Sequence, residues 1–193
     1  MLSRRAFVGA GTALAALAAT PARAMRLQID HTSGTPPSRR VVFDRTFPDG
    51  IAFGSTAAHR GAVLHAVGAD LGSFWMSTLE PLLKHGALTL AGLTAGAPLF
   101  CLELLCRDYG LSTVYRIEHR PAPDGGVVHF LSGDPALAAW TDRLAAAGAG
   151  WAVEAAALAT ASTLPRPATT IELLDLARGR ASQSLFTWVI GPT

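Results

Sequence analysis

The sequence contains only two cysteines among 193 residues, Cys101 and Cys106, and a chain so poor in cysteine cannot rely on a disulfide framework. The two lie five residues apart in one expected helix, so their side chains diverge by about 140° and cannot form a disulfide. Two thiolates at this spacing also lack the nearby partners that a metal site needs. We therefore expect two free thiols, both buried in the core, and no metal site.

Charged residues are also scarce, at 16% of the chain, whereas 50% of the residues are hydrophobic. Three of the 16 basic residues and none of the 14 acidic residues lie in the first 24 positions, so the remaining 169 residues carry a net charge of −1. This balance leaves no basic surface for nucleic acid or for an anionic membrane. The low charge indicates either a large core or an apolar surface that a partner covers.

Motifs for catalysis and for cofactors are missing as well. The sequence has no His-x-His or His-Glu-x-x-His metal pattern and no Gly-x-Ser-x-Gly nucleophile. Gly92-Leu-Thr-Ala-Gly96 lacks the spacing of a dinucleotide fingerprint and the lysine of a phosphate-binding loop. A tight turn from strand to helix is therefore favoured there over a phosphate site. The sequence identifies no cofactor, and a redox function would need a flavin or metal pocket of which it gives no sign.

The first 24 residues have a basic start, an apolar middle from residue 6 to 19, and small residues at the end. Within them, Ser3-Arg4-Arg5-Ala6-Phe7-Val8 resembles the twin-arginine (Tat) export signal. The weakly hydrophobic middle and Arg23 beside the expected cleavage point are similar to such leaders too. The resemblance implies that the Tat translocase exports the folded chain to the periplasm. Because no later segment reaches the ~18 apolar residues of a membrane span, only an uncleaved leader would leave the protein anchored.

Residues 25–40 contain glycine and two prolines among polar residues and predict an extended lead-in, whereas residues 41–193 predict a single domain. Its central unit is strand, loop, helix and strand, over Ala87–Leu93, Leu99–Tyr109 and Leu111–Arg120. Gly110 is placed to end the helix in the left-handed conformation. This β-α-β unit predicts a parallel strand pair with a right-handed crossover.

The other elements follow from similar apolar patterns. The turn from Pro121 to Gly126 predicts a hairpin between the runs at 114–119 and 127–131. Further strands are expected at 40–47, 62–67 and 184–190, the last beside the hairpin. Helices are expected at 48–61, 73–85 with a kink or break at Pro81, 134–144, 151–161 and 171–177.

This order predicts a single three-layer α/β domain with a mostly parallel, doubly wound sheet of the flavodoxin-like kind. The hairpin would extend it antiparallel at one edge, next to the C-terminal strand.

Open α/β sheets bind ligands beyond the carboxyl ends of their parallel strands. That edge would collect a set of polar side chains and a glycine-rich loop. The candidate catalytic residues are Asp44, Asp70, Thr94 and His119, with Glu118 nearby, and the candidate ligand contacts are Gly92, Thr94, Gly96 and Trp75. Ordinary structural roles compete with this interpretation: Asp70 as a cap, Trp75 and His65 as core residues, and His119 facing His129 across the hairpin.

Two functions follow. The first is a non-catalytic periplasmic protein, either an accessory subunit with a protein partner or a module that binds a small molecule. The alternative is a small hydrolase or isomerase that uses the sheet-edge residues. The enzyme would require these side chains to meet within about 3–5 Å of one pocket.

Overall fold

The computed structural model describes residues 39–68, 70–86, 88–161 and 184–192. The leader, the lead-in up to residue 38 and the helix expected at 171–177 lie outside the described residues. Within the described ranges, no helix has the length and apolar character that crossing a membrane requires.

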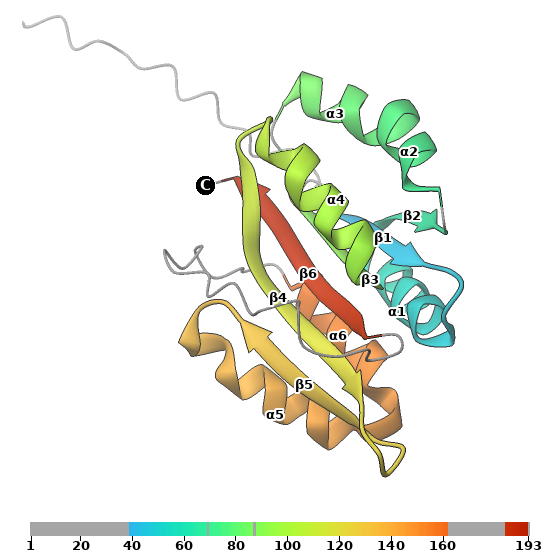
Figure 1. Cartoon of the computed structure of the whole chain (residues 1–193), viewed down its shortest axis with the longest axis vertical. Helices are drawn as coiled ribbons and strands as arrows, with labels where there is room; N and C mark the ends of the chain where they lie inside the picture. Colours follow the sequence, from blue (N-terminus) through green and yellow to red (C-terminus); the bar gives the residue numbers. More distant parts are fainter. Residues whose placement is uncertain (1–38, 69, 87, 162–183, 193) are drawn as a thin grey trace, which may run out of the picture. The chain divides into compact units, whose positions relative to one another are not determined.

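Six strands form one mixed sheet in the order β2-β1-β3-β6-β4-β5 (Figure 1). Runs of aliphatic and β-branched residues build these strands, as the sequence predicted. Their bounds are Arg40–Asp44 (β1), Val63–Val67 (β2), Leu90–Ala95 (β3), Leu111–Pro121 (β4), Val127–Ser132 (β5) and Leu185–Pro192 (β6).

The pairing of the strands differs from the predicted mostly parallel sheet. β1 pairs parallel with both β2 and β3, whereas the β3–β6, β6–β4 and β4–β5 pairs are antiparallel. Only the β2-β1-β3 part thus has the parallel order that a doubly wound sheet requires, and a flavodoxin-like winding of the whole sheet is not confirmed. The antiparallel hairpin of β4 and β5 is confirmed, and it lies at the edge of the sheet.

The predicted β-α-β unit is present, but its strands do not pair. β3 and β4 both run antiparallel to β6, which lies between them, so they share a direction without sharing hydrogen bonds. Residues Leu185–Gly191 of β6 are all buried, and a strand that is apolar on both faces belongs in the middle of a sheet. The connection through α4 (Gly96–Arg107) ends at Gly110, whose φ of 69° confirms the predicted left-handed position.

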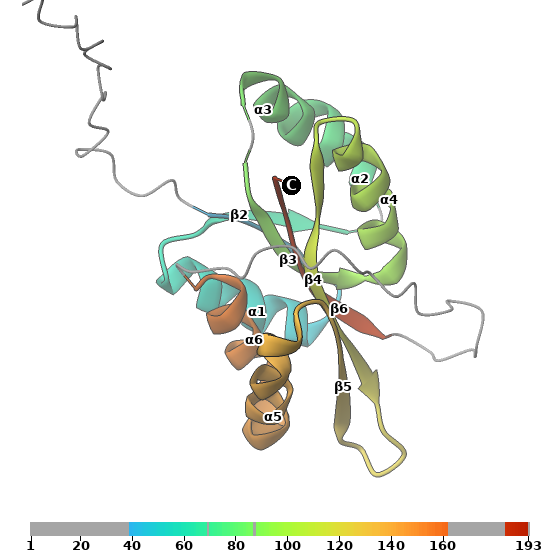
Figure 2. The ribbon, with the colours of Figure 1, turned by 90° about the vertical axis from the view of Figure 1, so that its left-hand side faces the viewer.

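Helices cover both faces of the sheet (Figure 2). One face packs against α1 (Pro48–His59), α5 (Ala138–Ala147) and α6 (Trp151–Ala159), with the 3₁₀ turns η2 (Pro135–Leu137) and η3 (Gly148–Gly150) beside α5. The other face packs against α4 and the continuous segment α2 (Leu71–Phe74), η1 (Trp75–Leu79) and α3 (Glu80–His85). Each face therefore has its own apolar core.

The two cysteines are free, as predicted, but only one is buried. Cys106 belongs to the core between α4 and the sheet, and burial raises the pKa of its thiol to about 12. Cys101 is exposed, which corrects the expectation that both thiols are buried. The five-residue spacing that separates the side chains also turns Cys101 to the solvent side of the helix.

Candidate functional site

The predicted edge of parallel strands exists. Because β1 lies between β2 and β3 and runs parallel to both, the carboxyl ends of the three strands share one edge of the sheet. The strands end there at Asp44, Val67 and Ala95. The side chains predicted to meet at this edge, however, are directed to different places.

Asp44 is buried and is engaged in the turn that follows β1. Its Oδ1 accepts hydrogen bonds from the backbone N–H of Thr46 at 2.9 Å and from the Thr46 hydroxyl at 2.6 Å. Only 5% of Asp44 is exposed. Its carboxylate therefore holds the chain as it leaves the sheet for α1.

Thr94 lies within the core between the sheet and α4. Its hydroxyl accepts a hydrogen bond of 3.0 Å from the indole Nε1 of Trp188, and both residues are fully buried. Gly92 makes room for this indole: a β-carbon at Gly92 would lie 2.4 Å from Cζ2 of Trp188. A β-carbon at Gly96 would similarly meet the ring of Phe186 at 3.2 Å. The predicted glycine-rich loop is thus the end of β3 and the start of α4, and its two glycines accommodate aromatic side chains of β6.

His119 lies on the opposite face of the sheet from Thr94. Its Nε2 is 2.8 Å from the Thr187 hydroxyl, whereas Trp188, the next residue, bonds to Thr94, and neighbouring residues of a strand point to opposite faces. Thr94 and His119 therefore cannot act on one substrate group.

The buried His119 pairs with the half-buried His129, its cross-strand neighbour, as the hairpin predicted. The two Nδ1 atoms are 2.7 Å apart, and the Trp151 ring lies over His119 with its centroid at 4.1 Å. Burial, and to a smaller extent the neighbouring His129, hold the pKa of His119 well below its usual value. Because burial lowers the pKa of both rings, the pair is held in its neutral form, in which one imidazole donates and the other accepts.

Glu118 is also engaged. Its carboxylate accepts two hydrogen bonds of 2.7 Å from Arg120, and this pairing lowers its pKa. Trp75, predicted as a ligand contact, is 8% exposed and packs edge-on against Tyr109 in the core.

An open hollow of about 700 Å³ lies at the carboxyl ends of β1 and β2, beside α2 and η1. Of the four candidate catalytic residues, only Asp70 lines it. We call it the carboxyl-edge hollow, and its lining consists of Arg45, Leu64, His65, Ala66, Val67, Gly68, Asp70, Ser73, Phe74, Ser77 and Thr78.

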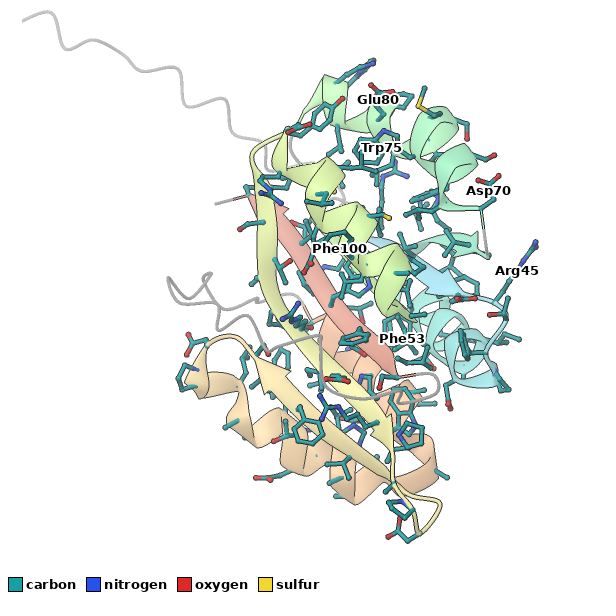
Figure 3. All side chains as sticks on the ribbon, in the orientation of Figure 1. Arg45, Phe53, Asp70, Trp75, Glu80 and Phe100 are labelled. Atoms are coloured by element: carbon teal, nitrogen blue, oxygen red, sulfur yellow. The ribbon has the colours of Figure 1, made fainter. Side chains whose placement is uncertain are left out.

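Opposite charges lie at the margin of this hollow. Figure 3 shows Arg45, which follows β1, and Asp70, which follows β2, on the same side of the sheet. Arg45 is exposed and forms no ion pair with a described residue. Asp70 accepts hydrogen bonds from the Ser73 hydroxyl at 2.5 Å and from the Ser73 N–H at 3.1 Å, and these bonds lower its pKa. The guanidinium and the carboxylate are thus both charged and accessible at neutral pH.

His65 contributes an uncharged ring to the hollow. Its Nε2 accepts a hydrogen bond of 3.2 Å from Arg40, and burial followed by the Arg40 charge lowers its pKa. The ring of Phe74 packs against it with centroids 5.1 Å apart. Together the two rings give the hollow an apolar floor next to its charged margin.

The segment that carries Ser77 and Thr78 is a π-helix. The N–H of Glu80 bonds to the carbonyl of Trp75, five residues back, and Pro81 directly follows. Since proline has no N–H for the carbonyl four residues earlier, the wider turn accommodates it without ending the helix. The predicted kink at Pro81 is therefore realised as a local widening over Trp75–Leu79. Such segments recur at functional sites.

Sequence reasoning missed most of the lining. Arg45, Ser77 and Thr78 belong to no motif, and His65 was interpreted as a core residue. The alternation of side chains along β2 gave a weak signal for His65, because a half-buried histidine on an edge strand can face a binding site as well as the core.

Within the described ranges, no three histidine, cysteine, aspartate or glutamate side chains gather closely enough to hold a metal ion. Comparison of the chain with known protein families, with curated proteins and with solved structures finds no match. The function must therefore be argued from the hollow itself.

Proposed function

We propose that the protein is a non-catalytic, exported module that binds a small polar ligand in the carboxyl-edge hollow. The observation that carries this proposal is that Arg45, which forms no ion pair with a described residue, and Asp70 line one hollow together with hydroxyl groups. Each of the other candidate catalytic groups already has a partner in the folded chain.

The candidate catalytic side chains do not converge on one pocket, which supports ligand binding over catalysis. Asp44, Thr94 and His119 are buried, they bond to three different neighbours, and two of them lie on opposite faces of the sheet. A hydrolase or isomerase needs an acid or base within reach of the reacting atom. Asp70 alone, with a lowered pKa, is a poor proton donor at neutral pH.

The lining favours a ligand with both an anionic and a donor group. The Arg45 guanidinium matches a carboxylate or phosphate, which it can hold with two parallel hydrogen bonds. The Asp70 carboxylate has acceptor capacity beyond its two bonds from Ser73, which suits an amine or a hydroxyl. A zwitterion of amino-acid size, with its apolar part on Phe74, satisfies all three features.

Export by the Tat route remains part of the proposal. The leader motif with Arg4, Arg5 and Phe7 supports a periplasmic protein that folds before export, and a protein partner that travels with it is compatible with this route. The parallel β2-β1-β3 strands support a doubly wound, flavodoxin-like start to the fold, which has its ligand edge where the hollow lies.

Titration by NMR tests the ligand. Adding leucine, acetate or inorganic phosphate to the purified protein should shift the amide signals of Gly68 and Ser73, most strongly with leucine, the zwitterion that has an apolar part. Arg45→Met should weaken the response about tenfold or more, as loss of a charge-assisted pair implies. Arg107→Met, an exposed arginine on α4, is the matched control and should change nothing. An unchanged affinity in Arg45→Met would refute the proposed site.

A separate experiment tests export. Replacing Arg4 and Arg5 by lysine should leave the protein in the cytoplasm, and normal export of this variant would contradict the Tat assignment. Native mass spectrometry of the particle purified from the periplasm then distinguishes a bound ligand, a partner chain and a bare protein.

A further inference from the structure

The outer edge of β5 is open. β5 is the last strand in the order of the sheet, and no described strand pairs with its outer side. Its sequence, Val-Val-His-Phe-Leu-Ser, contains neither a charged residue nor proline, which are the usual devices that prevent an edge strand from pairing. Val128 and Phe130 are 46% and 39% exposed.

The backbone of β5 offers hydrogen-bonding groups at regular positions along this edge. The N–H of Ala122 bonds to the carbonyl of Gly126 next to the hairpin turn. Because hydrogen-bonded and non-bonded pairs alternate along an antiparallel ladder, the register puts the backbone groups of Val127, His129 and Leu131 on the outer side. Pro121, which has no N–H, lies opposite Val127 at one of these non-bonded pairs, as expected.

The side chains of β5 divide between its two faces. Val127 and Leu131 pack against the core beneath α5 and α6, and His129 contacts His119 and Trp151 on that face. Val128 and Phe130 point to the other face, where Arg120 lies over the Phe130 ring with its guanidinium carbon 4.5 Å from the centroid. The exposed apolar pair is therefore separate from the core.

We propose that β5 pairs antiparallel with β5 of a second copy of this chain, about a two-fold axis at His129. In this register the backbone of His129 forms hydrogen bonds with the backbone of His129 in the second copy. The backbone of Val127 does so with that of Leu131 in the second copy. All three are positions whose N–H and C=O face outward. Val128 then lies opposite Phe130 of the second copy, at a non-bonded pair where side chains approach most closely.

Self-complementarity favours a second copy over an unrelated strand. The same axis that satisfies the backbone places each exposed apolar side chain against another, so the four form one cluster. In the joined sheet, each row across this face would run from Glu118 and Phe130 of one copy to Val128 and Arg120 of the other. A charged residue would therefore flank the apolar cluster on each side. A two-fold symmetric contact is the commonest way in which identical chains associate.

The pair should be weak. One pair of strands is a small contact beside the roughly 1,200–2,000 Å² that a stable interface buries, so we expect a weak, concentration-dependent dimer. Sedimentation equilibrium of the whole protein should therefore show monomer at low concentration and dimer at high concentration. A monomer at every concentration up to about 1 mM would overturn the proposal, since such a pair would be negligible.

Matched variants locate the contact. Phe130→Lys should raise the dissociation constant by about tenfold or more, because it removes two symmetric apolar pairs and adds two like charges. Phe100→Lys, on α4, replaces an aromatic side chain that is 52% exposed and should leave the dimer intact (Figure 3). Equal loss in both variants, or loss in neither, would contradict a β5 contact.

Cysteine trapping tests the register directly. In a Cys101→Ser background, a mixture of Val128→Cys and Phe130→Cys chains should form mixed disulfides much faster than either chain alone. Faster cross-linking of one variant with itself would refute the axis at His129. Because Val128 and Phe130 do not line the carboxyl-edge hollow, ligand binding and dimerisation can fail independently.

Discussion

Replacing Gly92 by alanine tests whether this glycine of β3 serves packing or ligand binding. The added β-carbon would lie 2.4 Å from Cζ2 of Trp188 and 2.5 Å from the carbonyl oxygen of Val42. Non-bonded carbons prefer about 3.5–4.0 Å, so both neighbours would have to retreat by about 1 Å. One is backbone in the middle of β1, and the other is a buried indole tied to Thr94, so neither can move freely.

The expected cost follows from these contacts. Overpacking a core destabilises by about 1–3 kcal/mol, and two rigid neighbours put Gly92→Ala at the upper end of that range. Alanine also restricts the unfolded chain, which stabilises the fold by about 0.4–1 kcal/mol. We therefore expect the free energy of unfolding to fall by about 2 kcal/mol. Trp188→Phe removes the clashing ring, so the double variant should be more stable than the sum of the single effects implies, by about 1–2 kcal/mol.

Urea unfolding followed by far-ultraviolet circular dichroism measures these differences. Gly191→Ala is the matched control: it is a buried glycine in β6, but its added β-carbon would meet the nearest atoms at 3.5 Å, an ordinary contact. The control should lose less than about 1 kcal/mol. If Gly92→Ala is as stable as Gly191→Ala, or if its effect is independent of Trp188, the packing argument is wrong. A stable Gly92→Ala that no longer binds ligand would instead indicate that Gly92 belongs to a binding site.

Two further predictions concern titratable groups. Burial lowers the pKa of His119 and His129, and the groups that face the pair, Thr187 and Trp151, are uncharged. As the pH falls, these histidines therefore take up protons in the unfolded chain before they do so in the folded protein. The free energy of unfolding should accordingly decrease below about pH 6.5. Its slope against pH should be flatter in His129→Gln and unchanged in the control His59→Gln, which replaces an exposed histidine. A stability that does not depend on pH would contradict the neutral pair. Iodoacetamide at pH 8 should alkylate Cys101 and spare Cys106 in the native protein, as mass spectrometry of peptides would show; equal labelling would indicate that Cys106 is not in the core.

Local signals in the sequence identify most elements of this fold. The run from Ala62 to Val67 predicts β2, the turn at Pro121–Gly126 predicts the hairpin, and Gly110 predicts the end of α4. These features depend on neighbouring residues, which the sequence displays directly. The predicted place of β6 beside the hairpin is confirmed by its pairing with β4. Its insertion between β3 and β4 was not predicted, because contacts between residues far apart in the chain decide it. Its apolar run, in which Thr187 is the one polar residue before Gly191, was a usable signal for a central strand.

The candidate site was less predictable. The common edge of the parallel strands followed from the order of elements, but the direction of each side chain did not. Thr94 points into the core because Trp188, 94 residues later, donates to it, and no local pattern shows this pairing. The hollow contains exposed polar residues such as Arg45 and Ser77, which resemble any solvated position in a sequence. Only the folded backbone, with its π-helical turn before Pro81, brings them together.

The placement of β6 determines when this protein can acquire its structure during synthesis. Every other described strand emerges from the ribosome earlier, yet β3 and β4 have no ladder between them until residues 185–192 arrive. A nascent chain that stops short of this strand would hold two partial sheets, each with an apolar flank that invites chaperones or aggregation. Productive folding must therefore follow translation of β6.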